Sequence, residues 1–396
     1  MTAGALSSTV PTTPATAAQQ PDWPDAGHVR AIRAILRERP PLVAEGEIRA
    51  LRDALGRAAA GGGIVLQAGD CAELFDESGP GPAARKIGQL SEASAALRAA
   101  SGLPVTTLGR IAGQYAKPRS APFEQGPDGG TLPSYRGDAV HGAAPDPGLR
   151  VPDPRRLLTA YGCAASTLAE LRRSWATVEP AERVYASHEL LLLDYEQPLV
   201  RDGEQGPYAG SAHFGWIGER TRGHDGAHLA LAASISNPVG VKLGPGVTPG
   251  EAVALCRRLD PDRVPGRLTF IVRMGSARIA TALPPVVAAV ARHGSRALWI
   301  SDPMHGNTIR TRAGHKTRAT DAIAAEITEF TRVLRTHGQW PGGIHLELTP
   351  DDVTECVTGP ATGAWDARLP SYRSACDPRL NPEQAAAIVR HFGALL

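Results

Sequence analysis

The stretch that decides the fold is GGGIVLQAGDCAE, residues 61–73. Three glycines end a helical pattern, a short apolar run covers residues 64–68, and a polar group follows at once. The run does not alternate apolar and polar residues, which indicates a strand buried on both faces of a parallel sheet. The polar residues that follow, Asp70 and Cys71, are therefore candidate functional residues at the carboxyl end of that strand.

Seven more runs of this kind follow, at residues 105–108, 184–186, 213–217, 239–243, 268–272, 297–301 and 344–348. Stretches with helical periodicity lie between many of them, at residues 83–100, 157–175, 249–259, 279–292 and 319–336. Eight β-α units predict an α/β fold, a (β/α)8 TIM barrel. A doubly wound open sheet is the alternative, but no G-x-G-x-x-G follows any run, which weakens a dinucleotide-binding form of it.

The chain ahead of the barrel divides into two parts. Residues 1–20 are rich in Ser, Thr, Ala and Pro and carry no charge, which predicts a disordered tail. Residues 21–60 contain two amphipathic helical stretches, separated by Pro40 and Pro41, and predict an N-terminal helical extension. The barrel, residues 61–396, is then the catalytic domain.

Composition excludes several classes of protein. With 42% hydrophobic residues among 396, the chain can bury a large core. A formal charge of +2 gives no net field to attract nucleic acid or an anionic membrane. No window approaches the roughly 20 apolar residues of a membrane helix. Five cysteines without a C-x-x-C pair argue against a disulfide framework or a zinc ribbon. We therefore expect a soluble, cytoplasmic protein with neither nucleic acid nor membrane as partner.

Residues at the strand ends carry the candidate chemistry, because a barrel places its active site there. One group is cationic: Arg110, Lys117, Arg119, Arg220, Lys242 and Arg273. Only four of the 42 basic residues are lysines, so a lysine within an apolar run is informative. Arginine and lysine bind phosphates and carboxylates. Six cations at one mouth predict a ligand set with more than one anionic group.

A second group offers metal donors. Cys71, His305 and Glu347, with an aspartate, would form a mixed sulfur, nitrogen and oxygen site that suits Mn, Co, Fe or Zn. Taken singly, a cysteine such as Cys71 is more often a small buried hydrophobe, and a histidine such as His305 is more often a loop residue hydrogen-bonded to the backbone. Glu347 is harder to explain otherwise, because a carboxylate inside a buried strand is costly unless it is paired or ligated.

Several motifs carry a resemblance to a known family. QAGDCAE, GRIAGQYAKPRS, SHELLLLDYE, WIGERTR, NPVGVKLGP, WISDPMHGNT, GGIHLELTPDDVTEC and CDPRLNPEQA occur in this order. Over residues 18–396 the chain resembles the plant-type, or type II, 3-deoxy-D-arabino-heptulosonate 7-phosphate (DAHP) synthases. The resemblance implies a (β/α)8 barrel that condenses phosphoenolpyruvate with erythrose 4-phosphate, releasing phosphate, at the first step of the shikimate pathway.

The resemblance also implies roles for single residues. A divalent metal ion (Mn or Co, with Zn or Fe as alternatives) would be held by Cys71, His305, Glu347 and Asp377. Phosphoenolpyruvate would contact Arg110, Glu219, Arg220, Lys242 and Arg273, and erythrose 4-phosphate would contact Lys117, Arg119 and Ser120. Lys117, Glu219 and His305 would act in catalysis, as proton donor, water-orienting carboxylate and metal ligand. We expect a homo-oligomer, a dimer.

The chain departs from the family in two places. Where the family usually reads RMGNHK, residues 273–278 read RMGSAR, which puts substrate placement at that loop in doubt. The segment at about 173–183 is short, whereas longer relatives carry a helical insertion linked to aromatic feedback and subunit contacts. With this short segment the chain resembles short family members that serve secondary metabolism, such as phenazine-type pathways. The missing insertion predicts weak feedback inhibition by aromatic amino acids. In addition, Cys376 beside Asp377 suggests that oxidation could join it to Cys71 and expel the metal.

Three other functions fit part of the pattern. An amino-DAHP synthase would use an amino or imino analogue of erythrose 4-phosphate and the same phosphate-binding residues. A non-catalytic relic that binds phosphorylated metabolites would be expected to have lost cations or metal donors, and none is lost. A plain hydrolase barrel does not explain the number of cations.

Overall fold

The computed structural model describes residues 17–126 and 129–396. Its centre is a closed barrel in which every neighbouring pair of strands is parallel. In order around the barrel the strands are β1 (Ile64–Gly69), β2 (Val105–Arg110), β5 (Val184–Glu189), β8 (Phe214–Ile217), β9 (Val239–Leu243), β10 (Leu268–Val272), β11 (Leu298–Ser301) and β14 (Gly343–Glu347). Each of the eight predicted runs forms one of these strands, which confirms the (β/α)8 fold.

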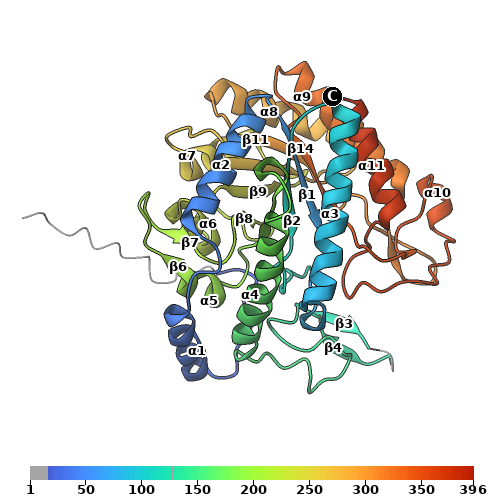
Figure 1. Ribbon diagram of the computed structural model, residues 1–396. Helices are drawn as coiled ribbons and strands as arrows, with labels where there is room; N and C mark the ends of the chain where they lie inside the picture. Colours follow the sequence, from blue (N-terminus) through green and yellow to red (C-terminus); the bar gives the residue numbers. More distant parts are fainter. Residues whose placement is uncertain (1–16, 127–128) are drawn as a thin grey trace, which may run out of the picture.

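Helices surround the strands (Figure 1). They are α3 (Pro80–Ser101), α4 (Arg156–Trp175), α6 (Ala227–Ser234), α7 (Pro249–Leu259), α8 (Ile279–His293), α9 (Thr320–Thr336) and α11 (Pro382–Ala394). The sequence pattern did not predict α6 or α11. The crossover from β5 to β8 replaces a full helix with the four-residue α5 (Leu193–Glu196) and a hairpin of β6 (Val200–Arg201) and β7 (Tyr208–Ala209).

The N-terminal extension consists of α1 (Ala26–Glu38) and α2 (Glu45–Ala59). Asp25 caps α1 by accepting hydrogen bonds from two backbone N–H groups. Leu51 and Leu55 of α2 belong to one buried cluster with inward-facing strand residues such as Val65 and Phe214. Helix α2 thus closes the amino end of the barrel, where the interior is apolar and needs a cover from water.

Residues 17–20 differ from the prediction of a disordered tail. Gln20 Nε2 donates to the carbonyl of Leu191 (2.8 Å), and its Oε1 accepts from the backbone N–H of Leu193 (3.0 Å). Gln19 Oε1 accepts from the backbone N–H of Arg119 (2.9 Å). The two glutamines satisfy polar groups of the barrel loops, so the chain contacts the barrel here. The tail predicted for residues 1–16 lies outside the described residues.

Additional segments extend the loops after β2, β11 and β14. The long loop at 121–150 contains a hairpin of β3 (Phe123–Gln125) and β4 (Thr131–Pro133), and a second hairpin of β12 (Ile309–Arg310) and β13 (Lys316–Thr317) precedes α9. The short α10 (Ala361–Ala364) lies between β14 and α11. Among the described parts of the chain, no helix has the length and apolar character needed to cross a bilayer.

A polar layer inside the barrel lies above the apolar cluster. His345 Nδ1 donates to Gln67 Oε1 (2.8 Å), and Gln67 Nε2 donates to Ser187 Oγ (3.2 Å). Burial, with Lys242 and Arg110 nearby, lowers the pKa of His345 well below its ordinary value, so the ring is neutral. Its Nε2 therefore accepts from Arg110 Nη1 (2.5 Å), and this layer orients Arg110 toward the carboxyl end of the barrel.

Candidate active site

A cavity of about 800 Å³ opens among the segments that follow the strands. The predicted residues that line it are Cys71, Arg110, Lys117, Arg119, Ser120, Glu219, Arg220, Lys242, Arg273, His305 and Asp377. Glu347, the last residue of β14, is fully buried and contacts several of them. Parallel strands end on one face of the barrel, which is why residues up to about 300 positions apart meet in one cavity.

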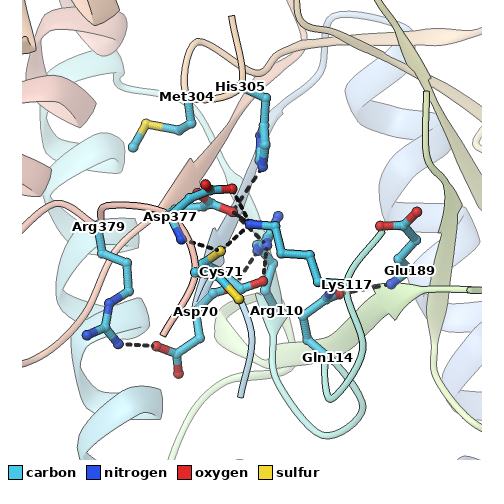
Figure 2. Close-up of polar contacts among 12 residues, drawn as sticks. Asp70, Cys71, Arg110, Gln114, Lys117, Glu189, Met304, His305, Asp377 and Arg379 are labelled. Atoms are coloured by element: carbon cyan, nitrogen blue, oxygen red, sulfur yellow. Dashed lines mark hydrogen bonds and ion pairs between the residues drawn. The ribbon is translucent and has the colours of Figure 1, made fainter. Parts of the chain in front are cut away.

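The predicted metal donors lie together. Donor atoms of Cys71, Glu347 and Asp377 all lie within 4.8 Å of one another. His305 Nε2 lies 3.0 Å from Glu347 Oε1. The ammonium of Lys117 contacts Cys71 Sγ and the Asp377 carboxylate and lies 3.9 Å from Glu347 Oε1 (Figure 2). The Lys117 ammonium therefore lies among the sulfur and oxygen donors, whose negative charge suits a positive ion, whereas His305 forms a second donor group with Asp302 and His345 and reaches the first group through Glu347.

Glu347 is held in its ionised form by cations. Arg110 Nη2 donates to Oε1 (3.0 Å) and Arg318 Nη1 to Oε2 (2.8 Å), and all three side chains are almost fully buried. Burial alone would raise the pKa of Glu347, but His305, Lys117 and the two arginines keep it well below the ordinary value. Arg318 was not among the predicted site residues. The signal for it was weak, because the residue follows β13 of a loop hairpin rather than a strand of the barrel.

Two of the predicted cations lie over one aromatic ring. The Arg110 guanidinium is 5.2 Å and Lys242 Nζ is 5.9 Å from the centre of the Trp216 ring. Trp216 lines the cavity, and cations over an indole face are attracted by its quadrupole. Lys242 Nζ also donates to Asp302 Oδ2 (2.8 Å), although burial lowers the pKa of Lys242 overall. Trp216 therefore forms part of the surface on which an anionic ligand would meet these cations.

Known proteins resemble this chain over most of its length. The model of the class-II DAHP synthetase family matches residues 11–181 and 176–392. The chain belongs to that family. A phospho-2-dehydro-3-deoxyheptonate aldolase of Streptomyces coelicolor is 44% identical over 418 residues, covering 93% of each chain. A probable phospho-2-dehydro-3-deoxyheptonate aldolase of Pseudomonas fluorescens is 45% identical over 379 residues, covering 94% of each.

A third relative and one solved structure extend the comparison. The corresponding aldolase of Mycolicibacterium smegmatis is 39% identical over 425 residues, covering 93% of this chain and 90% of that one. The solved phospho-2-dehydro-3-deoxyheptonate aldolase of Francisella tularensis has a TM-score of 0.56 at 13% identity, covering 92% of this chain and 95% of its own. The distant structure supports the fold, and the close relatives support the family. The chain is an enzyme of the DAHP synthase class.

The cations of this DAHP synthase differ in how firmly they are held. Arg119 pairs with Glu124 (3.0 Å), and Arg273 donates to the carbonyl of His305. Arg220 is exposed in the cavity wall, and within residues 17–126 and 129–396 no hydrogen bond or ion pair engages its guanidinium. Arg220 therefore keeps its donors free for a ligand.

Two carboxylates line the cavity beside the metal donors. Glu219 Oε2 accepts from the backbone N–H of Gly244 (2.7 Å), and Oε1 accepts from Arg222 Nη2 (3.1 Å). Glu189, which ends β5, has a buried Oε1 without a partner among the described residues, and burial raises its pKa. Figure 2 shows Gln114 bonded to the backbone of Glu189. Glu189 was not among the predicted site residues, although its position at a strand end was the available signal.

All four lysines of the chain lie around this end of the barrel. Lys86 Nζ lies 2.7 Å from Asp70 Oδ2, and Asp70 directly precedes Cys71. Lys316 Nζ lies 2.5 Å from Asp377 Oδ1. Lys316 lines the cavity and was also missing from the predicted set, although the scarcity of lysine was a usable signal. The acidic residues beside the thiol are thus paired with lysines.

Proposed function

We propose that this cavity condenses phosphoenolpyruvate with erythrose 4-phosphate, giving DAHP and inorganic phosphate. The observation that carries the proposal is one cavity that combines the cationic group with a sulfur, nitrogen and oxygen donor set. The two substrates carry two phosphates and one carboxylate, which accounts for the number of cations. The family and the names of the relatives support the same reaction.

We assign phosphoenolpyruvate to the part of the cavity around Trp216. Arg110 and Lys242 lie over that ring, and Arg220 and Arg273 line the same cavity. We assign erythrose 4-phosphate to the segment after β2. This second set consists of Lys117, Arg119 and Ser120, which are close together in the chain and line the cavity. The arrangement would bring the two substrates to the metal donors from separate groups of cations.

Four residues, Cys71, His305, Glu347 and Asp377, would hold a divalent metal ion, for which Mn and Co are the first candidates and Zn or Fe the alternatives. When bound, such an ion supplies Lewis acidity toward a carbonyl oxygen. With the ion bound, Cys71 would ligate as a thiolate beside the two carboxylates, and their three negative charges would more than offset the two positive charges of the ion. Lys117 is protonated, because Asp377, Cys71 and Glu347 outweigh the effect of burial and raise its pKa.

The reaction forms one carbon–carbon bond and breaks one carbon–oxygen bond. C3 of phosphoenolpyruvate attacks the aldehyde carbon of erythrose 4-phosphate, and Lys117 donates a proton to the resulting alkoxide. Water adds at C2, and phosphate then leaves by C–O cleavage, with arginines stabilising its charge. Glu219 is the carboxylate we first assign to orient this water. Both of its oxygens already accept protein hydrogen bonds, so Glu189, with its unpaired Oε1, is a second carboxylate that we place beside the water.

A chelation assay tests the proposal. Protein treated with chelator should regain turnover of phosphoenolpyruvate and erythrose 4-phosphate when Mn²⁺ or Co²⁺ is added. Cys71→Ser should not regain it, whereas Cys163→Ser, a free cysteine that does not line the cavity, should behave as wild type. A folded protein that binds phosphoenolpyruvate yet never turns over with this aldehyde would contradict the proposal and point to another acceptor.

We also propose that the enzyme serves secondary metabolism with weak aromatic feedback. Helix α4 ends at Trp175 and β5 begins at Val184, which leaves room for only a short 3-10 turn. The alignment to the Streptomyces coelicolor relative spans 418 positions, more than the 396 residues of this chain, so that relative has residues without a counterpart here. Inhibition by phenylalanine, tyrosine or tryptophan at low concentration would contradict weak feedback.

The proposal also covers the compartment and the oligomeric state of the enzyme. We place it in the cytoplasm, because its five cysteines are free and the proposed metal donor Cys71 needs a reducing compartment. We propose a homodimer, supported by the apolar side chains of Leu149 and Val151, which are 54% and 53% exposed. Sedimentation of the purified protein as a monomer would contradict the dimer.

A further inference from the structure

Glu326 is a buried acidic residue that the proposed reaction does not use. It lies on α9, on the face that carries the buried residues Ile323, Ile327 and Phe330. Its side chain has no exposed surface. A carboxylate in the packing face of an outer helix is costly unless it makes strong hydrogen bonds. Its position therefore needs an explanation.

Three hydrogen bonds connect Glu326 to two loops of the active-site end. Oε1 accepts from the backbone N–H groups of Met274 and Gly275, each at 2.8 Å. Oε2 accepts from Asn307 Nδ2 at 2.7 Å. Met274 and Gly275 follow β10, whereas Asn307 follows β11, so one carboxylate joins the ends of two neighbouring strands.

The same two loops contact each other directly. Asn307 Oδ1 accepts from the backbone N–H (3.0 Å) and from Oγ (3.1 Å) of Ser276. Gly275 has φ +82°, and a Cβ on Gly306 would lie 2.2 Å from its nitrogen, so the two backbones can meet only as glycines. Ser276 stands where the family usually has asparagine. Its hydroxyl makes a link between the loops, which keeps this segment in place despite the departure.

Each loop carries a residue of the active site. Arg273 directly precedes Met274, and its guanidinium donates to the carbonyl of His305. The ring of His305 reaches Glu347 among the metal donors. A shift of one loop against the other would therefore move a proposed phosphoenolpyruvate ligand and a proposed metal donor together.

We infer that Glu326 is a positioning residue that couples the anion-binding and metal-donor sides of the cavity by holding residues 273–276 and 305–307 in one arrangement. The inference rests on the function proposed above. Glu326 touches neither substrate nor metal in this assignment, and it acts through Arg273 and His305.

Glu326→Gln tests the coupling with a nearly isosteric change. The amide oxygen can still accept from both backbone N–H groups, but the new NH₂ faces the NH₂ of Asn307 and breaks that link. Loss of a hydrogen bond to a charged group predicts about a tenfold rise in KM for phosphoenolpyruvate and about a tenfold weaker Mn²⁺ affinity by calorimetry. The KM for erythrose 4-phosphate should stay within about twofold, since Lys117 and Arg119 lie on another loop.

Glu329→Gln is the matched control, because Glu329 lies on the same helix and pairs with Arg332 on its exposed side. It should leave the KM for phosphoenolpyruvate and the Mn²⁺ affinity, the two constants tested here, at the wild-type values. A folded Glu326→Gln protein with both constants within about twofold of wild type would overturn the inference. Should Glu326→Gln fail to fold, Asn307→Ser cuts the same link from the other side and carries the same expectation and the same contrary result.

A double variant distinguishes loss of the Glu326–Asn307 hydrogen bond from a general disturbance of the fold. Asn307→Asp alone places two carboxylates against each other and should impair both constants. Combined with Glu326→Gln, the new carboxylate can accept from the new amide and from Ser276. We therefore expect the double variant to lie closer to wild type than either single variant. Losses that simply add would overturn the inference.

The two levels of proposal fail in different ways. Wild-type protein without turnover of phosphoenolpyruvate and erythrose 4-phosphate would defeat the proposed function. Wild-type turnover, with phosphoenolpyruvate binding lost in Arg273→Ala but unchanged in Glu326→Gln, would defeat only the role of Glu326.

Discussion

His305 Nδ1 lies 2.8 Å from Asp302 Oδ2, so the buried carboxylate of Asp302 fixes the ring of His305. The opposite nitrogen, Nε2, then faces Glu347 Oε1 at 3.0 Å. With a metal ion bound in place of the Nε2 proton, a histidine that donates to a carboxylate from one nitrogen would present the other as a lone-pair donor of fixed direction. The same aspartate also binds Lys242, so one side chain orients a metal donor and a substrate-binding cation.

Asp302→Asn should therefore weaken metal binding without removing a metal ligand. Loss of such an outer partner costs about 10- to 100-fold in metal affinity, which calorimetric titration of metal-free protein with Mn²⁺ would measure. Asp321→Asn, at the exposed start of α9, is the control. Unchanged Mn²⁺ affinity in a folded Asp302→Asn protein would show that His305 is oriented without Asp302.

Arg220→Ala should affect substrate binding and leave stability unchanged. Its guanidinium is exposed and has no hydrogen bond or ion pair within the described ranges, so its loss breaks no protein contact. A charge-assisted bond to phosphate predicts a KM for phosphoenolpyruvate raised about tenfold or more. Steady-state kinetics and a thermal melt measure the two effects. Arg257→Ala, exposed on α7, should change neither, and a normal KM in Arg220→Ala would remove this residue from the substrate site.

Stability should fall as pH rises through the titration of Glu326. Burial, with Asp302 nearby, raises the pKa of Glu326 from 4.5 to about 7, so the folded protein binds more protons than the unfolded chain in that interval. Linkage then makes the free energy of unfolding decrease with pH, by about 3 kcal/mol across the interval. Urea unfolding at about pH 5 and about pH 8 should show a larger decrease for wild type than for Glu326→Gln. Equal decreases in the two proteins would contradict the prediction.

Oxidation should join Cys71 to Cys376. The two cysteines belong to one buried cluster with Tyr135, and both side chains line the cavity. Hydrogen peroxide would take one hydrogen from each thiol and be reduced to water as the disulfide forms, which removes Cys71 as a metal donor. Peptide mapping without reductant should find the linked pair, and dithiothreitol should restore activity. Equal activity with and without the oxidant would contradict the prediction that this disulfide inactivates the enzyme.

Much of the molecule could be predicted from local patterns. The eight apolar runs and the helices at 157–175 and 319–336 follow from periodicity, because burial on both faces or on one stripe leaves its mark on adjacent residues. Because parallel strands end on one face of a barrel, the sequence also predicted that Arg110, Lys242 and His305 would meet, and all three line the cavity. Asp377 needed the family resemblance, since it lies beyond the last strand in an irregular segment.

By itself, the sequence determined the barrel, the order of its strands and the chemical character of its mouth, because these depend on short-range periodicity and on residue type. Only the tertiary structure decided which groups meet. Arg318 pairs with Glu347, Trp216 lies beneath Arg110, and Glu326 reaches from an outer helix to two loops. Such contacts join residues far apart in the chain and depend on strand register and helix placement. A hydrogen bond needs its partners within about 3 Å, and no local pattern encodes that distance.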